Sequence, residues 1–308
     1  MTDILGIELL TFRFLISVVG IVGNIILIMS IFKIARLKTF EILLLGLAVS
    51  NLEGIIIVDV YDIIIIVSSS SLAMGNGSVC TTLKFLTVFG EVTTILFTML
   101  ISIFRYQKLR DAEKRVNLPV PMDSVPMVIG LSGSCVLLAF AFGAPTYIMN
   151  IDGHMTNHTG NTTCPPDFFQ CPGGFCPTRN MIYKYSYLLL CILVPLCVVT
   201  VTSGHILKIL LVQWRAVTPQ TVGPAQSNFP RRKSSGFQRS TIAVLAAMAV
   251  FQVDWIVYLV LHLILDPYKF RSWSETEFFI TTTYSTISPY VYGAGNNLFS
   301  LKHLCRAK

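Results

Sequence analysis

The stretch CTTLKFLTVFGEVTTILFTMLISIFRY, residues Cys80–Tyr106, decides the fold of this chain. Four of its polar residues recur at intervals of seven, namely Lys84, Glu91, Thr98 and Arg105. Seven residues make nearly two helical turns, so these side chains project from one side of a helix whose other sides are apolar. A polar stripe on an apolar helix predicts a membrane span whose stripe faces other helices rather than lipid.

The composition of the whole chain agrees with a membrane protein. Of the 308 residues, 53% are hydrophobic and only 13% are charged, which excludes an ordinary soluble domain and predicts several membrane spans. The net charge of +7 invites a nucleic-acid partner, but the basic residues form no single patch and we expect none. The first apolar run begins near Ile7, and we expect it to be an uncleaved signal anchor because it is longer than the apolar core of a signal peptide.

The apolar runs predict an all-α, seven-transmembrane-helix bundle that forms a single domain over residues 1–308. The predicted helices cover residues 7–32, 42–67, 81–106, 125–149, 185–212, 241–265 and 277–292. Pro195 could kink the fifth helix. Two long loops are expected, over residues 150–184 and 213–239. We find no internal repeat, which disfavours a transporter built from inverted repeats.

The distribution of Lys and Arg predicts the orientation in the membrane. On one face they lie at the ends of the first, third and fifth helices, in the 213–239 loop and in the tail, together 17 of the 23. Loops rich in Lys and Arg stay in the cytoplasm, so we expect the N-terminus outside and the C-terminus inside. Three glycosylation sequons fall in the predicted outer loops, at Asn76, Asn157 and Asn161.

The cysteines divide between the outer loops and the spans. Four are expected on the outer, oxidising face, where two disulfides with three possible connectivities could form; these are Cys80, Cys164, Cys171 and Cys176. Cys135, Cys191 and Cys197 lie within spans and should be packing residues. Cys305 is a palmitoylation candidate because basic residues flank it, and Ser234 is a kinase-site candidate because it follows Arg231-Arg232-Lys233; a free thiol and an idle match are the alternatives.

Several short motifs occur in a fixed order along the chain. They are Gly23-Asn24, Leu47-Ala48-Val49-Ser50-Asn51, Phe104-Arg105-Tyr106, the pair Phe251 and Trp255, and Ser288-Pro289-Tyr290-Val291-Tyr292. With seven spans and a cysteine at the start of the third helix, this order resembles the rhodopsin-like (class A) G-protein-coupled receptors. The motifs depart from the family pattern at Asn51, where Asp is usual, at Phe104, which replaces an acid, and at Ser288, which replaces Asn.

The sixth helix also departs from the pattern, because it carries Asp254 and lacks the usual proline. The chain is similar to vomeronasal type-1 receptors in three features: a fourth helix without Trp, the run Ser288-Pro289-Tyr290-Val291-Tyr292-Gly293, and short termini. The fish relatives of that group, the olfactory receptor class A-like proteins, look most similar. The resemblance implies a chemosensory receptor in the plasma membrane of sensory neurons. Its partners would be a small odorant or pheromone, a heterotrimeric G protein and the lipid bilayer, with no cofactor, metal or enzymatic activity. A receptor for a peptide, an amine or a bitter compound and a small-solute transporter are the alternatives.

The ligand site should occupy the outer half of the bundle. Glu91 lies 11 residues after Cys80, roughly 16 Å along the helix, a depth that suits the floor of a pocket. Thr87 and Val88 lie one turn above Glu91, and Lys84 should be near the mouth. An ionisable residue inside a span is a functional candidate, although Glu91 could be a structural carboxyl group and Lys84 could reach the head groups.

Three further residues complete the predicted ligand site. Asp62 lies 11 residues beyond Asn51 in almost the same helical direction, and Asp254 and Trp255 occupy the middle of the sixth helix. An ion pair between Lys84 and either Asp59 or Asp62 would be a purely structural explanation for those residues. Trp255 could act as a packing switch without touching a ligand.

The resemblance assigns Arg105, Tyr106 and Tyr292 to the G-protein end. An acid usually restrains the arginine in this fold, but Phe104 cannot do so, and residues 213–253 contain no Asp or Glu. We therefore expect Arg105 to lack a restraining acid and the receptor to show activity without ligand.

Overall fold

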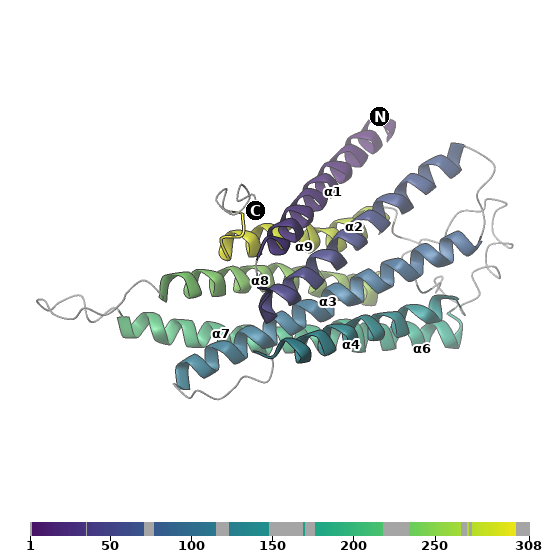
Figure 1. Cartoon of the computed structure of the whole chain (residues 1–308). Helices are drawn as coiled ribbons and strands as arrows, with labels where there is room; N and C mark the ends of the chain where they lie inside the picture. The colour runs from purple at the N-terminus through teal and green to yellow at the C-terminus, as the bar shows by residue number, and fades with distance from the viewer. Residues whose placement is uncertain are drawn as a thin grey trace, which may run out of the picture.

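The computed structural model describes residues 2–34, 36–70, 77–114, 123–147, 169, 176–217, 234–265, 270 and 273–299. Among these residues there is no strand, and seven helical stretches run alongside one another (Figure 1). They are α1 (Thr2–Phe32), α2 (Thr39–Ser70), α3 (Gly77–Lys114), α4 (Val125–Gly143) with the short turn η2 (Ala144–Tyr147), the continuous stretch α6 (Thr178–Tyr187), η3 (Leu188–Leu193) and α7 (Val194–Val217), α8 (Ser234–Ile264) and α9 (Trp273–Gly295). The predicted seven-helix, all-α bundle is confirmed.

Six of the described stretches are long and apolar enough to cross a membrane. The seventh, α9, is more polar because Ser and Thr interrupt it repeatedly. The other helices surround most of α3, whereas α4 turns most of its surface outward. The polar stripe of α3 faces inward, since Lys84, Thr98 and Arg105 are buried and Glu91 is largely so.

Most helices are longer than their apolar runs. The third helix continues to Lys114, the fifth begins at Thr178 and ends at Val217, and the sixth begins at Ser234. The predicted loops over 150–184 and 213–239 are therefore too long. An apolar run reports the thickness of the membrane, whereas a helix satisfies its own backbone hydrogen bonds and can continue into water.

The fifth helix changes its winding just before Pro195. Residues Leu188–Leu193 form a π-helical turn between two α-helical segments. A proline has no backbone N–H and its ring crowds the preceding turn, so a wider turn accommodates it without ending the helix. A π-helical turn therefore precedes Pro195, and the helix continues beyond the proline.

Buried polar side chains connect α2, α3 and α9. The Asn51 amide donates to Ser288 Oγ over 3.0 Å, and Asn51 Oδ1 accepts from Thr94 Oγ1 over 3.2 Å. Ser285 Oγ donates to the same Asn51 oxygen over 3.3 Å. A hydrogen bond inside a membrane protein joins helices where lipid offers no alternative partner.

Glycines allow close helix contacts. A Cβ atom at Gly46 would overlap the Phe97 ring of α3, and a Cβ atom at Gly23 would lie within 2.6 Å of the Tyr290 ring of α9.

We name the two ends of the bundle after residues near the two ends of α3. The Cys80 end contains the starts of α1, α3 and α6, and the Arg105 end contains the starts of α2 and α8 and the end of α9.

Candidate functional site

A small cavity lies between α2, α3, α8 and α9, about midway along the bundle. It offers about 20 Å³ to the centre of a water molecule, which is enough for one or two waters or a group of that size. Its lining residues are Gly54, Ile55, Val58, Thr87, Gly90, Glu91, Thr94, Trp255, Thr281, Thr282 and Ser285.

Glu91 provides the carboxyl group of the cavity. The Tyr187 hydroxyl of α6 donates to Glu91 Oε2 over 2.8 Å. Tyr187 is only 1% exposed, so α6 is joined to the centre of α3 through a buried hydrogen bond.

A second carboxyl group, that of Glu53 on α2, lies beside the same cavity wall. Both of its oxygens are buried and have no hydrogen-bond partner among the described residues. The Glu53 carboxyl group lies so close to Gly90 that even a methyl group at Gly90 would overlap it. Gly90 therefore leaves room for the Glu53 carboxyl group next to the residue that precedes Glu91, although Glu53 is not itself among the residues that line the cavity.

Four aromatic side chains cover the bundle on the Cys80 side of the cavity. We call Phe169, Tyr183, Tyr187 and His262 the roof cluster. Phe169 comes from the predicted loop, is only 1% exposed, and its ring centre lies 5.5 to 6.0 Å from those of the other three. On α8, His262 stacks on Tyr258 at 4.0 Å, and Tyr258 packs at 5.1 Å from Trp255. Aromatic contacts therefore run from the roof cluster down to the cavity.

The structure brings together only part of the predicted ligand site. Thr87, Glu91 and Trp255 line the cavity, whereas Val88 is buried outside the lining. Asp254 also lies outside it, half-buried beside the backbone of Tyr284. The side chain of Asp62 falls outside the described residues.

Lys84 and Asp59 differ from their predicted positions. Lys84 is 4% exposed, so it neither reaches the head groups nor stands at an open mouth. The Asp59 carboxyl group accepts a hydrogen bond from Ser17 of α1 over 2.6 Å, which directs it away from Lys84. The structural alternative of an ion pair between Lys84 and Asp59 is therefore not what the structure shows, whereas the same alternative with Asp62 concerns a side chain outside the described residues.

Arg105 has neutral partners at the other end of the bundle. Its Nη2 donates to Ser240 Oγ of α8 over 2.6 Å and to Asn296 Oδ1 over 3.2 Å. Ser240 Oγ also donates to Asn296 Oδ1 over 2.6 Å. The guanidinium carbon lies 3.6 Å from the centre of the Phe40 ring. We call Arg105, Ser240, Asn296 and Phe40 the Arg105 cluster; as predicted, it contains no acid among the described residues, but neutral partners hold the arginine.

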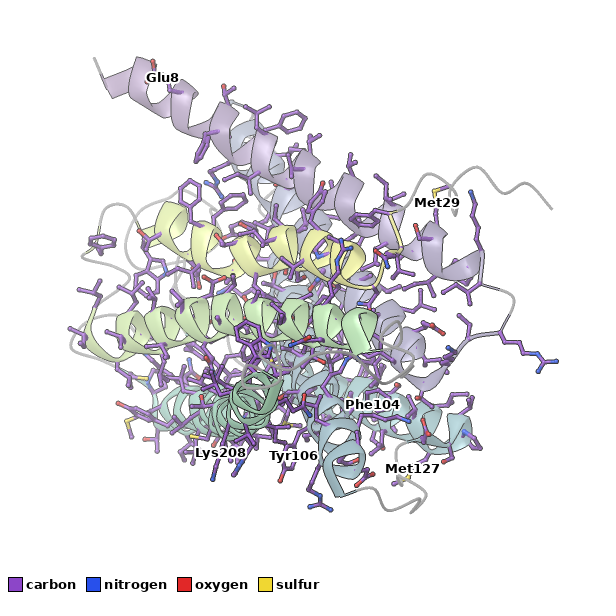
Figure 2. All side chains as sticks on the ribbon, turned by 90° about the vertical axis from the view of Figure 1, so that its left-hand side faces the viewer. Glu8, Met29, Phe104, Tyr106, Met127 and Lys208 are labelled. Carbon is purple, nitrogen blue, oxygen red and sulfur yellow. The ribbon has the colours of Figure 1, made fainter. Side chains whose placement is uncertain are left out.

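The other predicted G-protein residues lie near this cluster with different exposure. Tyr292 is fully buried, whereas Tyr106 is partly exposed beside α7, its ring 5.4 Å from His205. Figure 2 shows Tyr106 near Phe104 of α3 and Lys208 of α7. In this conformation Tyr106 is therefore the more accessible of the two tyrosines.

Only some of the cysteines and modification sites predicted from the sequence lie within the described residues. Cys80 and Cys176 are both disulfide-bonded. Cys164, Cys171, Asn76, Asn157 and Asn161 lie outside the described residues, as does Cys305, and so does the side chain of Ser234. Cys135 and Cys191 are buried free thiols, whereas Cys197 is exposed on the bundle surface and does not pack in the core.

Sequence reasoning missed Glu53, Tyr187 and Phe169. A signal for Glu53 was present, because an acid in an apolar span is unusual, but its direction depends on Gly90 of another helix. No comparable signal marks Phe169, since an aromatic residue in a loop rich in Pro and Gly gives no indication that it will be buried.

Comparisons with known proteins agree with this architecture. The family model for 7 transmembrane receptors of the rhodopsin family matches residues 23–292. The gonadotropin-releasing hormone receptor of Octopus vulgaris is 23% identical over 297 residues, covering 91% of this chain and 68% of that receptor.

Proposed function

The chain belongs to the rhodopsin family of seven-transmembrane receptors, and we propose that it is a chemosensory receptor for a small organic ligand. Members of this family bind a ligand and signal to a G protein, and they are not enzymes. The cavity and the roof cluster would form the ligand site, and the end that carries Arg105 would meet the heterotrimeric G protein. We further propose that the Cys80 end faces outward, in the plasma membrane of chemosensory neurons.

The observation that carries the proposal is the burial of Phe169. Its ring fills the space between Tyr183, Tyr187 and His262 above the cavity. A peptide entering deeply would have to displace this aromatic cluster, whereas a small molecule can be enclosed beneath it. Enclosed, mostly apolar sites with a few polar groups are typical of small-molecule recognition.

The motif departures support the chemosensory part of the proposal. The run Ser288–Gly293 in α9 and the absence of Trp in α4 are similar to vomeronasal type-1 receptors and their fish relatives. A peptide-hormone receptor is the second candidate, because the octopus relative is named for a peptide hormone. In that case the ligand would contact mainly the loops at the Cys80 end.

Ligand-evoked GTP exchange in cells that co-express a G protein separates the two candidates. Small amines, aromatic acids and steroid-like amphiphiles should include an agonist, and short amidated peptides should not. Phe169→Ala should raise the agonist concentration for half-maximal response about tenfold or more, because the ligand would lose contact with an enclosed aromatic ring and such burial contributes about 1.5–3 kcal/mol.

Phe14→Ala is the matched control, since Phe14 of α1 is 64% exposed on the surface. Both variants should reach the cell surface in normal amounts. A response to peptides alone, or equal potency for Phe169→Ala and Phe14→Ala, would rule out a small-molecule site beneath the roof cluster.

A further inference from the structure

The pair Glu53 and Glu91 has no cationic partner in the described part of the chain. Neither carboxyl group forms an ion pair with a described Lys, Arg or His. Asp59, six residues further along α2, differs because it interacts with a cation, the guanidinium group of Arg13 on α1, besides accepting a hydrogen bond from Ser17. Adjacent buried carboxylates cannot both carry uncompensated charge, so positive charge must join them as protons or as a bound cation.

Trp255 provides an independent indication of a ligand in the same cavity. It is only 4% exposed and lines the cavity, yet its indole N–H has no acceptor among the described residues. Buried donors without an acceptor are uncommon in folded proteins. Because Trp255 lines the cavity, an acceptor atom of a molecule bound there would complete its hydrogen bonding.

These two observations together define the group that fits. We propose that the cavity between α2, α3, α8 and α9 binds the head group of a primary amine, with its ammonium toward Glu53 and Glu91 and a nearby hydroxyl or carbonyl oxygen toward Trp255. This inference rests on the proposed small-molecule function and names the ligand class. A primary ammonium is close to water in size and suits a space of about 20 Å³, whereas a quaternary ammonium is too large.

Gly90 is the positioning residue of the site. Because a methyl group at Gly90 would overlap the Glu53 carboxyl group, Gly90→Ala should push Glu53 away while leaving both acids in the chain. The site should then lose amine binding as it does in Glu53→Gln. A matched glycine substitution is Gly130→Ala, because a Cβ atom there meets nothing within 4 Å.

The test uses thermal unfolding of the purified full-length receptor with small probes at matched ionic strength. Ethanolamine carries both groups, ethylamine lacks the oxygen, choline is quaternary and ethylene glycol is uncharged. Ethanolamine should raise the unfolding temperature of the wild type most strongly, ethylamine less, and choline and ethylene glycol little. Specific binding to the folded state is what raises the unfolding temperature.

Substitutions then assign the effect to the site. Glu53→Gln, Glu91→Gln and Gly90→Ala should each raise the half-maximal ethanolamine concentration about tenfold or more, because each loses a charge-assisted contact. Asp59→Asn and Gly130→Ala should behave as wild type. Trp255→Phe should abolish the preference for ethanolamine over ethylamine and leave ethylamine unchanged.

Several results would overturn the inference. Equal stabilisation by ethylene glycol, stabilisation by Na⁺ alone, or an ethanolamine effect that survives in Glu53→Gln and Glu91→Gln would each do so. If small-molecule agonists are found and all of them are acids or neutral compounds, the proposed small-molecule function is supported and the amine site is contradicted. Amine binding that depends on both glutamates in a receptor activated only by peptides would do the reverse.

Discussion

At the scale of single residues, Phe104 changes how the arginine beside it is restrained. Phe104 is 3% exposed, and its ring stacks on Phe40, with the ring centres 6.0 Å apart. Phe40 in turn covers the Arg105 guanidinium. The arginine therefore rests on an aromatic ring and two neutral acceptors, where an acid would form an ion pair. Cation–π contacts and hydrogen bonds to a charged group can together replace a partly exposed ion pair.

Loss of Ser240 should release this restraint. Ser240→Ala removes the 2.6 Å contact to Arg105 and the 2.6 Å contact to Asn296. A hydrogen bond to a charged group contributes about 1.5–3 kcal/mol, so ligand-free GTP exchange per surface receptor should rise about tenfold or more. The control is Ser134→Ala, because Ser134 is exposed and bonds only its own helix. If the two variants show the same basal exchange, the Arg105 cluster does not hold the resting state.

The sequence predicts the residues of this site unevenly. The seven-residue spacing of α3 correctly directs Glu91 and Arg105 inward, because one helix determines those directions. Spacing within one helix does not determine how deeply a side chain is buried among neighbouring helices. The burial of Lys84 and the positions of Val88 and Asp254 outside the cavity therefore could not be predicted. The neutral partners of Arg105 could not be predicted for the same reason, since Ser240 and Asn296 are distant in sequence.

At the scale of elements, small residues determine how closely the helices approach. Gly46 brings α2 against the Phe97 ring of α3, and this pair of helices also carries Glu53 and Glu91. The sequence predicts which segments cross the membrane, because twenty apolar residues are needed whatever their neighbours. It does not predict helix ends, the π-helical turn or the depth of close contacts, because these depend on packing and on water beyond the membrane.

A larger side chain at Gly46 should force α2 and α3 apart. Gly46→Val would overlap Phe97, and overpacking a buried contact costs about 1–3 kcal/mol. We expect a lower unfolding temperature in detergent and less receptor at the cell surface. Gly204→Ala is the control, because a Cβ atom at Gly204 meets nothing within 4 Å. An unfolding temperature for Gly46→Val no lower than that of the control would contradict the close contact.

At the scale of the whole molecule, the polar stripe of α3 contacts most of the other helices in turn. Five of its side chains each form a hydrogen bond with a different helix. These are Glu91 with Tyr187 of α6, Thr94 with Asn51 of α2, Thr98 with Tyr284 of α9, Ser102 with Thr202 of α7, and Arg105 with Ser240 of α8. A ligand that displaces α3 or its partners near the cavity therefore acts on an element whose other end carries the Arg105 cluster. Ligand and G protein would thus bias the same arrangement of helices.

The disulfides at the Cys80 end should control this coupling by holding the roof cluster. Cys176 follows Phe169 by seven residues and lies next to the start of α6. We predict that Cys80 and Cys176 pair with each other and that Cys164 pairs with Cys171. Because one bond is lost in every case, Cys80→Ser, Cys176→Ser and the double variant should lower the free energy of unfolding equally, by about 2–4 kcal/mol. All three should also weaken agonist potency, since Phe169 would no longer be held over the cavity.

Peptide mapping of the unreduced receptor should recover Cys80 and Cys176 in one linked fragment. The matched control is Cys197→Ser, which removes an exposed free thiol and should change neither the unfolding free energy nor agonist potency. A Cys80 peptide linked to Cys164 or Cys171 would show that a different part of the loop is tied to α3. The same conclusion would follow if the double variant lost the sum of the unfolding free energies lost in the two single variants, because two cysteines in separate disulfides contribute independently. In that case Phe169 would be held by aromatic packing alone, and agonist potency should respond to Phe169→Ala but not to Cys176→Ser.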